Sequence, residues 1–167
     1  KELGSKGHVI TKPEDLFKEP YVLEFLGLKE SASYSESRLE SAIIEKLEHF
    51  LLELGKGFTF VARQQRIAFD ESRFYVDLVF YNRLLRCFVL IDLKIGELKH
   101  QDLGQMQMYV NFYDREIKLS DENNTIGLIL CKDKKDAIVE YTLPNDNNQI
   151  FARKYKTILP SKKKLQL

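Results

Sequence analysis

The 167-residue sequence has few of the residues that cross-link, bend or metallate small proteins: two Cys, three His and four Pro. Two cysteines cannot hold an iron–sulfur cluster, and together with three scattered histidines they do not indicate a structural zinc site. Cys87 and Cys131 lie within apolar runs, so they are interpreted as buried free thiols of a reduced, cytoplasmic protein. A chain of this length can bury a core without such cross-links.

Long apolar runs and an excess of one charge are also lacking. No stretch approaches the roughly 20 apolar residues that span a bilayer, so no membrane partner is expected. The first residues carry no signal-peptide core and no Met, which favours a fragment of a longer protein. The 26 basic and 25 acidic residues leave a net charge of +1, so a nucleic acid would be bound by a local patch rather than by bulk charge.

Periodicity and turn residues predict an α/β (α+β) fold, with a mixed central sheet flanked by helices. In chain order we expect a helix over 36–54, strands over 58–69, 74–81 and 87–95, a helix over 101–116, and strands over 125–131 and 136–143. The short connections make the first three strands antiparallel neighbours. Residues 1–30 are expected to be a lead-in with one docked helix at 21–26, and residues 31–160 to be the domain. Residues 161–167 would be a basic tail.

The two middle strands are expected to select their register through their apolar side chains. Side chains alternate along a strand, so one arrangement gives a wholly apolar face on which Phe74 also lies. Its pairs are Val76 with Leu93, Leu78 with Ile91, and Phe80 with Val89. A slip by one residue would place acids in that face.

Two carboxylates meet on the opposite face in this register. Asp77 faces Asp92, with Cβ atoms roughly 4.5–5.5 Å apart, and Lys94 lies on the same face two residues further along. Like charges this close are unfavourable unless a cation lies between them or one acid is protonated. Oxygen ligands without histidine favour Mg²⁺ or Mn²⁺. The alternative is a solvated sheet face that carries a simple Asp–Lys salt bridge.

Three polar residues on the two helices are further candidates. Glu40 falls inside the apolar stripe of the first helix, which makes it a candidate third carboxylate. The alternative is that Glu40 pairs with an arginine such as Arg63 or Arg66. On the second helix Gln105 and Tyr109 are i,i+4 neighbours and point the same way, which alone is a weak signal.

These residues resemble the PD-(D/E)xK nuclease superfamily, in which an acid is followed by a second acid and a lysine two residues apart. Here the acid is Asp77 and the triplet is Asp92-Leu93-Lys94, after a helix that bears Glu40. The superfamily has an αβββαβ core, the restriction-endonuclease-like fold, which matches the order predicted above. Within residues 19–160, several stretches resemble more narrowly the YhcG-type nuclease domain: 19–28, 50–58, 74–81 and 126–132.

The resemblance implies a metal-dependent nuclease domain that hydrolyses phosphodiester bonds of DNA. Asp77 and Asp92, with the Leu93 carbonyl, would bind Mg²⁺, with Mn²⁺ able to substitute. Lys94 would be the catalytic lysine, and Glu40 would be a further catalytic acid that reaches the metal through water. Val76 stands where many relatives have proline, and Asp92 where many have glutamate.

The resemblance also implies contacts with nucleic acid. Gln105 and Tyr109 are similar to a Q-x-x-x-Y element that positions DNA, and Arg63-Gln64 matches a polar pair on the first strand. Together with Arg66 and Lys99, these four residues are the expected nucleic-acid-binding set.

The resemblance extends to partners and to one alternative function. Related proteins usually carry an N-terminal helical domain that is thought to bind DNA, and this chain lacks it. Homodimerisation is expected by analogy. The alternative function is a catalytically inactive module of the same fold, kept for DNA binding or dimerisation.

Overall fold

One mixed sheet organises the part of the chain that the computed structural model describes, residues 21–22, 36–45 and 54–156. Its elements are β1 (Tyr21–Val22), α2 (Glu36–Glu45), β2 (Phe58–Phe69), β3 (Ser72–Asn82), β4 (Cys87–Glu97), α4 (His100–Phe112), β5 (Ile126–Asp133), α5 (Asp136–Thr142) and β6 (Ile150–Lys156). Helix α4 continues into a π-helical turn, η3 (Tyr113–Ile117). None of the helices in these ranges is long and apolar enough to cross a membrane.

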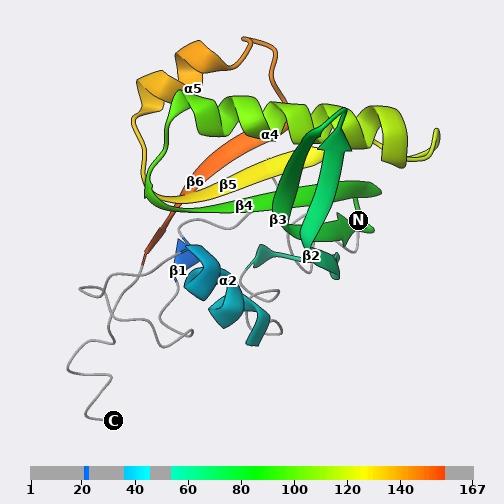
Figure 1. Ribbon diagram of the computed structural model, residues 1–167, viewed down its shortest axis with the longest axis horizontal. Helices are drawn as coiled ribbons and strands as arrows, with labels where there is room; N and C mark the ends of the chain where they lie inside the picture. The colour runs from blue at the N-terminus through cyan, green and yellow to red at the C-terminus, as the bar shows by residue number, and fades with distance from the viewer. Residues whose placement is uncertain (1–20, 23–35, 46–53, 157–167) are drawn as a thin grey trace, which may run out of the picture.

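The strands lie in the order β1-β6-β5-β4-β3-β2. The pairs β2–β3 and β3–β4 are antiparallel, whereas β4, β5, β6 and β1 run parallel to one another. A parallel pair needs a crossover connection, and α4 provides it between β4 and β5. Helix α4 covers one face of the sheet and α2 the other (Figure 1). The order α2-β2-β3-β4-α4-β5 is therefore the predicted αβββαβ core.

The core has two layers, one on each face of the sheet. Leu78, Phe80 and Ile91 pack on the α2 side, and Val79 and Leu90 pack on the α4 side. Strand β5 contributes to both layers, as expected for an apolar run covered on both faces. The two cysteines are buried and free, as predicted.

The register predicted for the middle strands is confirmed over half of their length. It runs from the pair Leu78–Ile91 to the pair Asn82–Cys87. The apolar face predicted beyond Leu78 is wrong, because Val76 and Phe74 pack on the α4 side instead.

The cause is a bend of the β2–β3 hairpin toward α4 (Figure 1). Phe69 meets Phe112 with ring centroids 5.2 Å apart, and Phe74 meets Tyr109 at 6.3 Å. Such edge-to-face contacts stabilise the bent hairpin beyond the burial of area alone.

Two segments differ from the predicted elements. Residues 136–143 were predicted as a strand, but 136–142 form helix α5. Val139 of this helix and Leu143 just after it pack on the α4 side of the sheet. A spacing of four residues suits a helix, but in so short a run it does not separate helix from strand. The sixth strand is β6, from a region interpreted as loop and tail.

The N-terminal predictions are only partly covered by the described residues. Residues 21–22 are a strand rather than part of a helix, and they pair in parallel with β6. The helix predicted over 36–54 does begin at Glu36, whereas residues 46–53 lie outside the described ranges. The domain limits at 31 and 160 stay predictions.

Candidate active site

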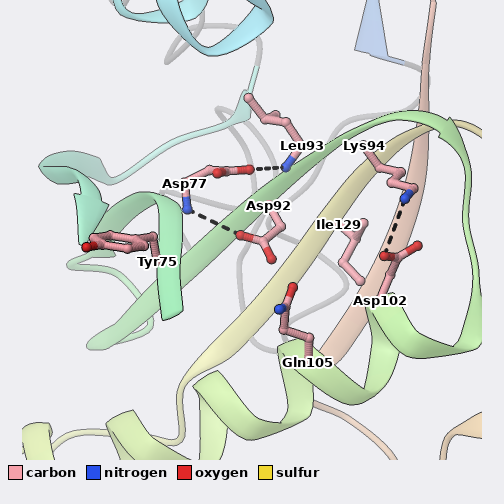
Figure 2. Close-up of a pocket in the computed structure, with 8 residues that line it drawn as sticks. All are labelled: Tyr75, Asp77, Asp92, Leu93, Lys94, Asp102, Gln105 and Ile129. Atoms are coloured by element: carbon pink, nitrogen blue, oxygen red, sulfur yellow. Dashed lines mark hydrogen bonds and ion pairs between the residues drawn. The ribbon is translucent and has the colours of Figure 1, made fainter. Parts of the chain in front are cut away.

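The two acids meet where β3 leaves β4. The backbone N–H of Asp77 donates to Asp92 Oδ1 (3.2 Å), and the backbone N–H of Leu93 donates to Asp77 Oδ2 (2.8 Å) (Figure 2). Carboxylate oxygens thus accept the hydrogen bonds that strand carbonyls would accept in a continued ladder. The arrangement brings both carboxylates to one point, although the pairing of β3 with β4 ends one residue earlier, at Leu78–Ile91.

A polar cavity of about 140 Å³ lies beside this point, between β3, β4, β5 and α4. Its lining residues are Tyr75, Asp77, Asp92, Leu93, Lys94, Asp102, Gln105 and Ile129. The bend of the β2–β3 hairpin toward α4 creates this concave shape, because it turns the start of β3 out of the sheet. A concave site with converging charged groups is where ligand binding is expected first.

Lys94 lies on the cavity wall next to α4. Its Nζ atom is 3.6 Å from Asp102 Oδ1, and the two side chains are 28% and 24% exposed. Figure 2 shows the amine directed at Asp102. Lys94 therefore forms a salt bridge with Asp102 of α4, an acid outside the sheet face for which the alternative Asp–Lys salt bridge was considered. Asp102 was not among the predicted site residues, although it is an acid in the first turn of the helix that follows the Asp-Leu-Lys strand.

Glu40 pairs with an arginine, as the alternative interpretation expected, and its role as a third carboxylate of the site stays a prediction. The side chain is only 4% exposed, as expected from the apolar stripe, and its Oε1 accepts a hydrogen bond from Arg63 Nη2 at 2.8 Å. Its Oε2 accepts a second bond from Gln64 Nε2 at 2.6 Å. Gln64 Nε2 also lies 3.0 Å from Asp77 Oδ1. Glu40 is thus linked to Asp77 through the Gln64 amide, and its predicted approach to a metal through water stays a prediction.

The Q-x-x-x-Y pair is divided between surface and core. Gln105 lines the cavity and reaches toward Asp92 from α4 (Figure 2). Tyr109 is only 2% exposed, and its hydroxyl donates to the carbonyl of Tyr75 at 3.3 Å. Burial raises the pKa of Tyr109, and the charges of Asp92 and Asp77 raise it further. A side chain this buried supports the site from beneath, and the contact of Tyr109 with nucleic acid stays a prediction.

Three exposed residues are connected to the cavity lining: Tyr75 is part of it, Arg66 pairs with Tyr75, and the Lys99 N–H donates to Asp102. Arg66 is exposed and pairs across the hairpin with Tyr75, so the two side chains share one face. The Tyr75 side chain is 47% exposed, and its ring points away from the acids (Figure 2). Lys99 is exposed at the start of α4. Tyr75 was not among the predicted site residues, because an alternating strand pattern does not separate a cavity rim from open surface.

The donor set fits one hard cation that completes its coordination with water or substrate. Within the described ranges, no three His, Cys, Asp or Glu side chains are grouped closely enough to hold a metal by themselves. Mg²⁺ usually keeps several waters and is bound through one or two carboxylates together with substrate phosphates. Asp77 and Asp92 beside an open polar cavity meet that requirement.

Comparison with known proteins shows the family of the chain. Residues 14–167 match the model of the family described as the YhcG PDDEXK nuclease domain. The chain belongs to this family. It is also 45% identical over 153 residues to "Putative nuclease YhcG" of Escherichia coli (strain K12). That alignment covers 92% of this chain but 40% of the relative, so the chain spans about two fifths of the relative's length.

Two solved structures share part of the arrangement. One is described as a repair endonuclease from Pyrococcus abyssi, with a TM-score of 0.49 and 16% identity over 79% of this chain and 50% of that one. The other is an EndoMS–dsDNA2 complex, with a TM-score of 0.48 and 13% identity over 81% of this chain and 50% of that one. The predicted restriction-endonuclease-like fold class is confirmed, and the family match together with the αβββαβ core carries that conclusion.

Proposed function

We propose that this nuclease domain hydrolyses phosphodiester bonds of DNA with one Mg²⁺ ion, which Mn²⁺ can replace. Asp77 and Asp92 would hold the cation, with the Leu93 carbonyl as a further ligand. The observation that carries the proposal is the junction of β3 and β4, where backbone hydrogen bonds tie the two carboxylates together beside a polar cavity.

The two acids and the lysine would have different roles in this reaction. When bound, the cation supplies positive charge that offsets the charge of the scissile phosphate and lowers the pKa of water. Asp77 and Asp92 are oriented before any ligand arrives, because backbone N–H groups hold one oxygen of each. Lys94 brings an ammonium group to the same cavity. It would orient the attacking water or stabilise charge that grows on the phosphate oxygens.

DNA would lie across the open side of the cavity. Gln105 lines the cavity. Arg66 and Lys99 are exposed, and each contacts a lining residue: Arg66 pairs with Tyr75, and the Lys99 N–H donates to Asp102. Their contacts would be mostly with phosphates, so affinity should fall steeply as the salt concentration rises. The exposed Tyr75 ring beside Arg66 adds a surface on which a base can stack.

Cleavage of a panel of labelled single-stranded, duplex and branched DNA tests the proposal. With Mg²⁺ we expect cleavage by the wild-type chain and a loss of at least about 100-fold for Asp77→Asn, Asp92→Asn or Lys94→Met, consistent with loss of electrostatic transition-state stabilisation. Asp121→Asn is the matched control, because Asp121 pairs with Arg86 on an exposed surface. Each variant should keep the wild-type circular dichroism spectrum.

Two outcomes would overturn the proposal. Full cleavage by the Asp77 and Asp92 variants, or cleavage in excess EDTA, would place the chemistry elsewhere. DNA binding without cleavage of any substrate by the wild-type chain would favour the inactive DNA-binding module instead.

A further inference from the structure

Gln64 has an unusual backbone at a position opposite the first acid. It lies between the paired residues Arg63–Leu78 and Gln65–Val76, and so opposite Asp77. Its φ angle is +48°, in the left-handed region that non-glycine residues seldom adopt. A strained conformation persists only when the surrounding structure holds it, and such residues gather at functional sites. The strain therefore calls for a specific explanation at Gln64.

The side chain of Gln64 supplies that explanation. Its amide nitrogen lies 2.6 Å from Glu40 Oε2 and 3.0 Å from Asp77 Oδ1. The two carboxylates come from different elements, α2 and β3. A single NH₂ group, which has two protons to donate, thus joins two acids that would otherwise repel each other.

Both oxygens of Asp77 are then held. Leu93 N–H holds Oδ2, and Gln64 holds Oδ1. The terminal torsion of an aspartate is broad, so one hydrogen bond alone would leave the carboxylate free to rotate. An amide orients the group without a positive charge, so the negative charge of Asp77 is kept for a cation. Arg63, in contrast, offsets the charge of Glu40 directly at 2.8 Å.

We propose that Gln64 is a positioning residue that sets the Asp77 carboxylate for the cation, and that Glu40 acts through Gln64 rather than as a cation ligand. The proposal deepens the proposed function, since it takes Asp77 as a ligand of the cation. It replaces the predicted contact of Gln64 with nucleic acid by a role inside the site. It also predicts a single cation, because the Gln64 amide occupies the space between Glu40 and Asp77.

Calorimetric titration of the 167-residue chain with Mn²⁺, without DNA, tests the proposal. We expect one ion per chain for the wild type. Gln64→Asn should keep an amide and a residue that tolerates the left-handed region, but it is one methylene too short to join both acids. Removal of such a supporting partner lowers metal affinity by roughly 10- to 100-fold, and the stoichiometry should stay at one. Gln65→Asn is the matched control, because the exposed Gln65 side chain contacts the Arg66 carbonyl at 3.5 Å and neither of the two acids. The Mn²⁺ affinity of this variant should not change.

A double-mutant cycle tests the role of Glu40. If Glu40 acts through Gln64, the pair Glu40→Gln and Gln64→Asn should lose no more affinity together than the weaker-binding single variant. Additive losses, or two ions per wild-type chain, would overturn the indirect role of Glu40. Wild-type Mn²⁺ affinity in Gln64→Asn would overturn the positioning role while leaving the proposed function intact. Absence of Mn²⁺ binding by the wild-type chain would overturn both.

Discussion

The carboxylate of Asp102 contacts both the candidate catalytic lysine and the start of helix α4. Its Oδ1 lies 3.6 Å from Lys94 Nζ, and its Oδ2 accepts a hydrogen bond from the backbone N–H of Lys99 at 2.8 Å. An acid at the third helical position that bonds back to the N-cap residue stabilises the first turn. The position of the Lys94 amine is therefore coupled to the N-terminal turn of α4. This turn lies across the cavity from Asp77 and Asp92 (Figure 2).

Asp102→Asn should slow DNA cleavage while keeping the fold. Asparagine retains an oxygen for the Lys99 N–H but removes the charge beside Lys94, so the amine is no longer held. Displacement of a reacting group by about 1 Å can cost roughly 100-fold in rate, and we expect a loss of 10- to 100-fold under saturating Mg²⁺. Asp136→Asn is the control, because Asp136 also lies in the first turn of its helix, α5, and pairs with Lys134 at 2.8 Å, but it does not line the cavity. Wild-type cleavage rates in Asp102→Asn would contradict the prediction.

Much of this arrangement could be predicted because it depends on local pattern. The alternation of apolar residues fixed the pairs from Leu78–Ile91 onward, and the same alternation brought Asp77 and Asp92 together. The bend beyond Leu78 could not be predicted, because it depends on contacts between Phe69 and Phe112, which are far apart in the sequence. The left-handed backbone at Gln64 was hidden for a similar reason: its side chain is held by acids from two other elements.

Tyr109→Phe should weaken the support of the site without removing the ring. The hydroxyl donates to the carbonyl of Tyr75, so its loss leaves a partly buried acceptor unpaired at a cost of about 1 kcal/mol. We expect a lower thermal midpoint and unchanged DNA affinity, because the hydroxyl is buried. Tyr141→Phe is the control, since that side chain is 82% exposed on α5. A loss of DNA affinity in Tyr109→Phe without a lower thermal midpoint would instead support a direct contact of the Tyr109 hydroxyl with DNA.

Alkaline pH should destabilise the protein through its buried thiols. Burial raises the pKa of Cys131 from 9.0 to about 11 and that of Cys87 from 9.0 to about 12. The fold keeps both thiols neutral. Their contribution to the free energy of unfolding is therefore complete below pH 9 and is lost as the pH rises through the folded pKa values. Urea titrations between pH 8 and pH 11 should show the free energy of unfolding falling by up to about 1.4 kcal/mol per pH unit for each thiol.

The variant with both cysteines replaced by alanine is the control for this pH dependence. It should start less stable, because two core side chains are shortened, but its stability should fall less between pH 9 and pH 11. Equal slopes for the variant and the wild type would contradict the assignment to the thiols. A thiol-reactive dye at pH 8 should label the folded wild type slowly and the urea-unfolded chain rapidly. The labelling rate rises with the fraction of thiolate and with the solvent exposure of the thiol.

Gly127→Ala should destabilise the protein because β5 and α4 approach closely at this residue. A Cβ atom on Gly127 would lie 2.5 Å from Met106 Cγ and 3.0 Å from Val110 Cγ2. Both neighbours are buried in the layer beneath α4, so neither can move without opening the core. Overpacking of this kind costs typically about 1–3 kcal/mol. The free energy of unfolding in urea should fall by that amount, and Mg²⁺-dependent cleavage should fall too, because α4 carries Gln105 and Asp102.

Gly104→Ala is the matched control: nothing lies within 4 Å of the added Cβ, and alanine is favoured over glycine inside a helix by about 1 kcal/mol. Gly104→Ala should therefore raise stability, and a Gly127→Ala variant as stable as the wild type would show that α4 can shift away from the sheet at little cost.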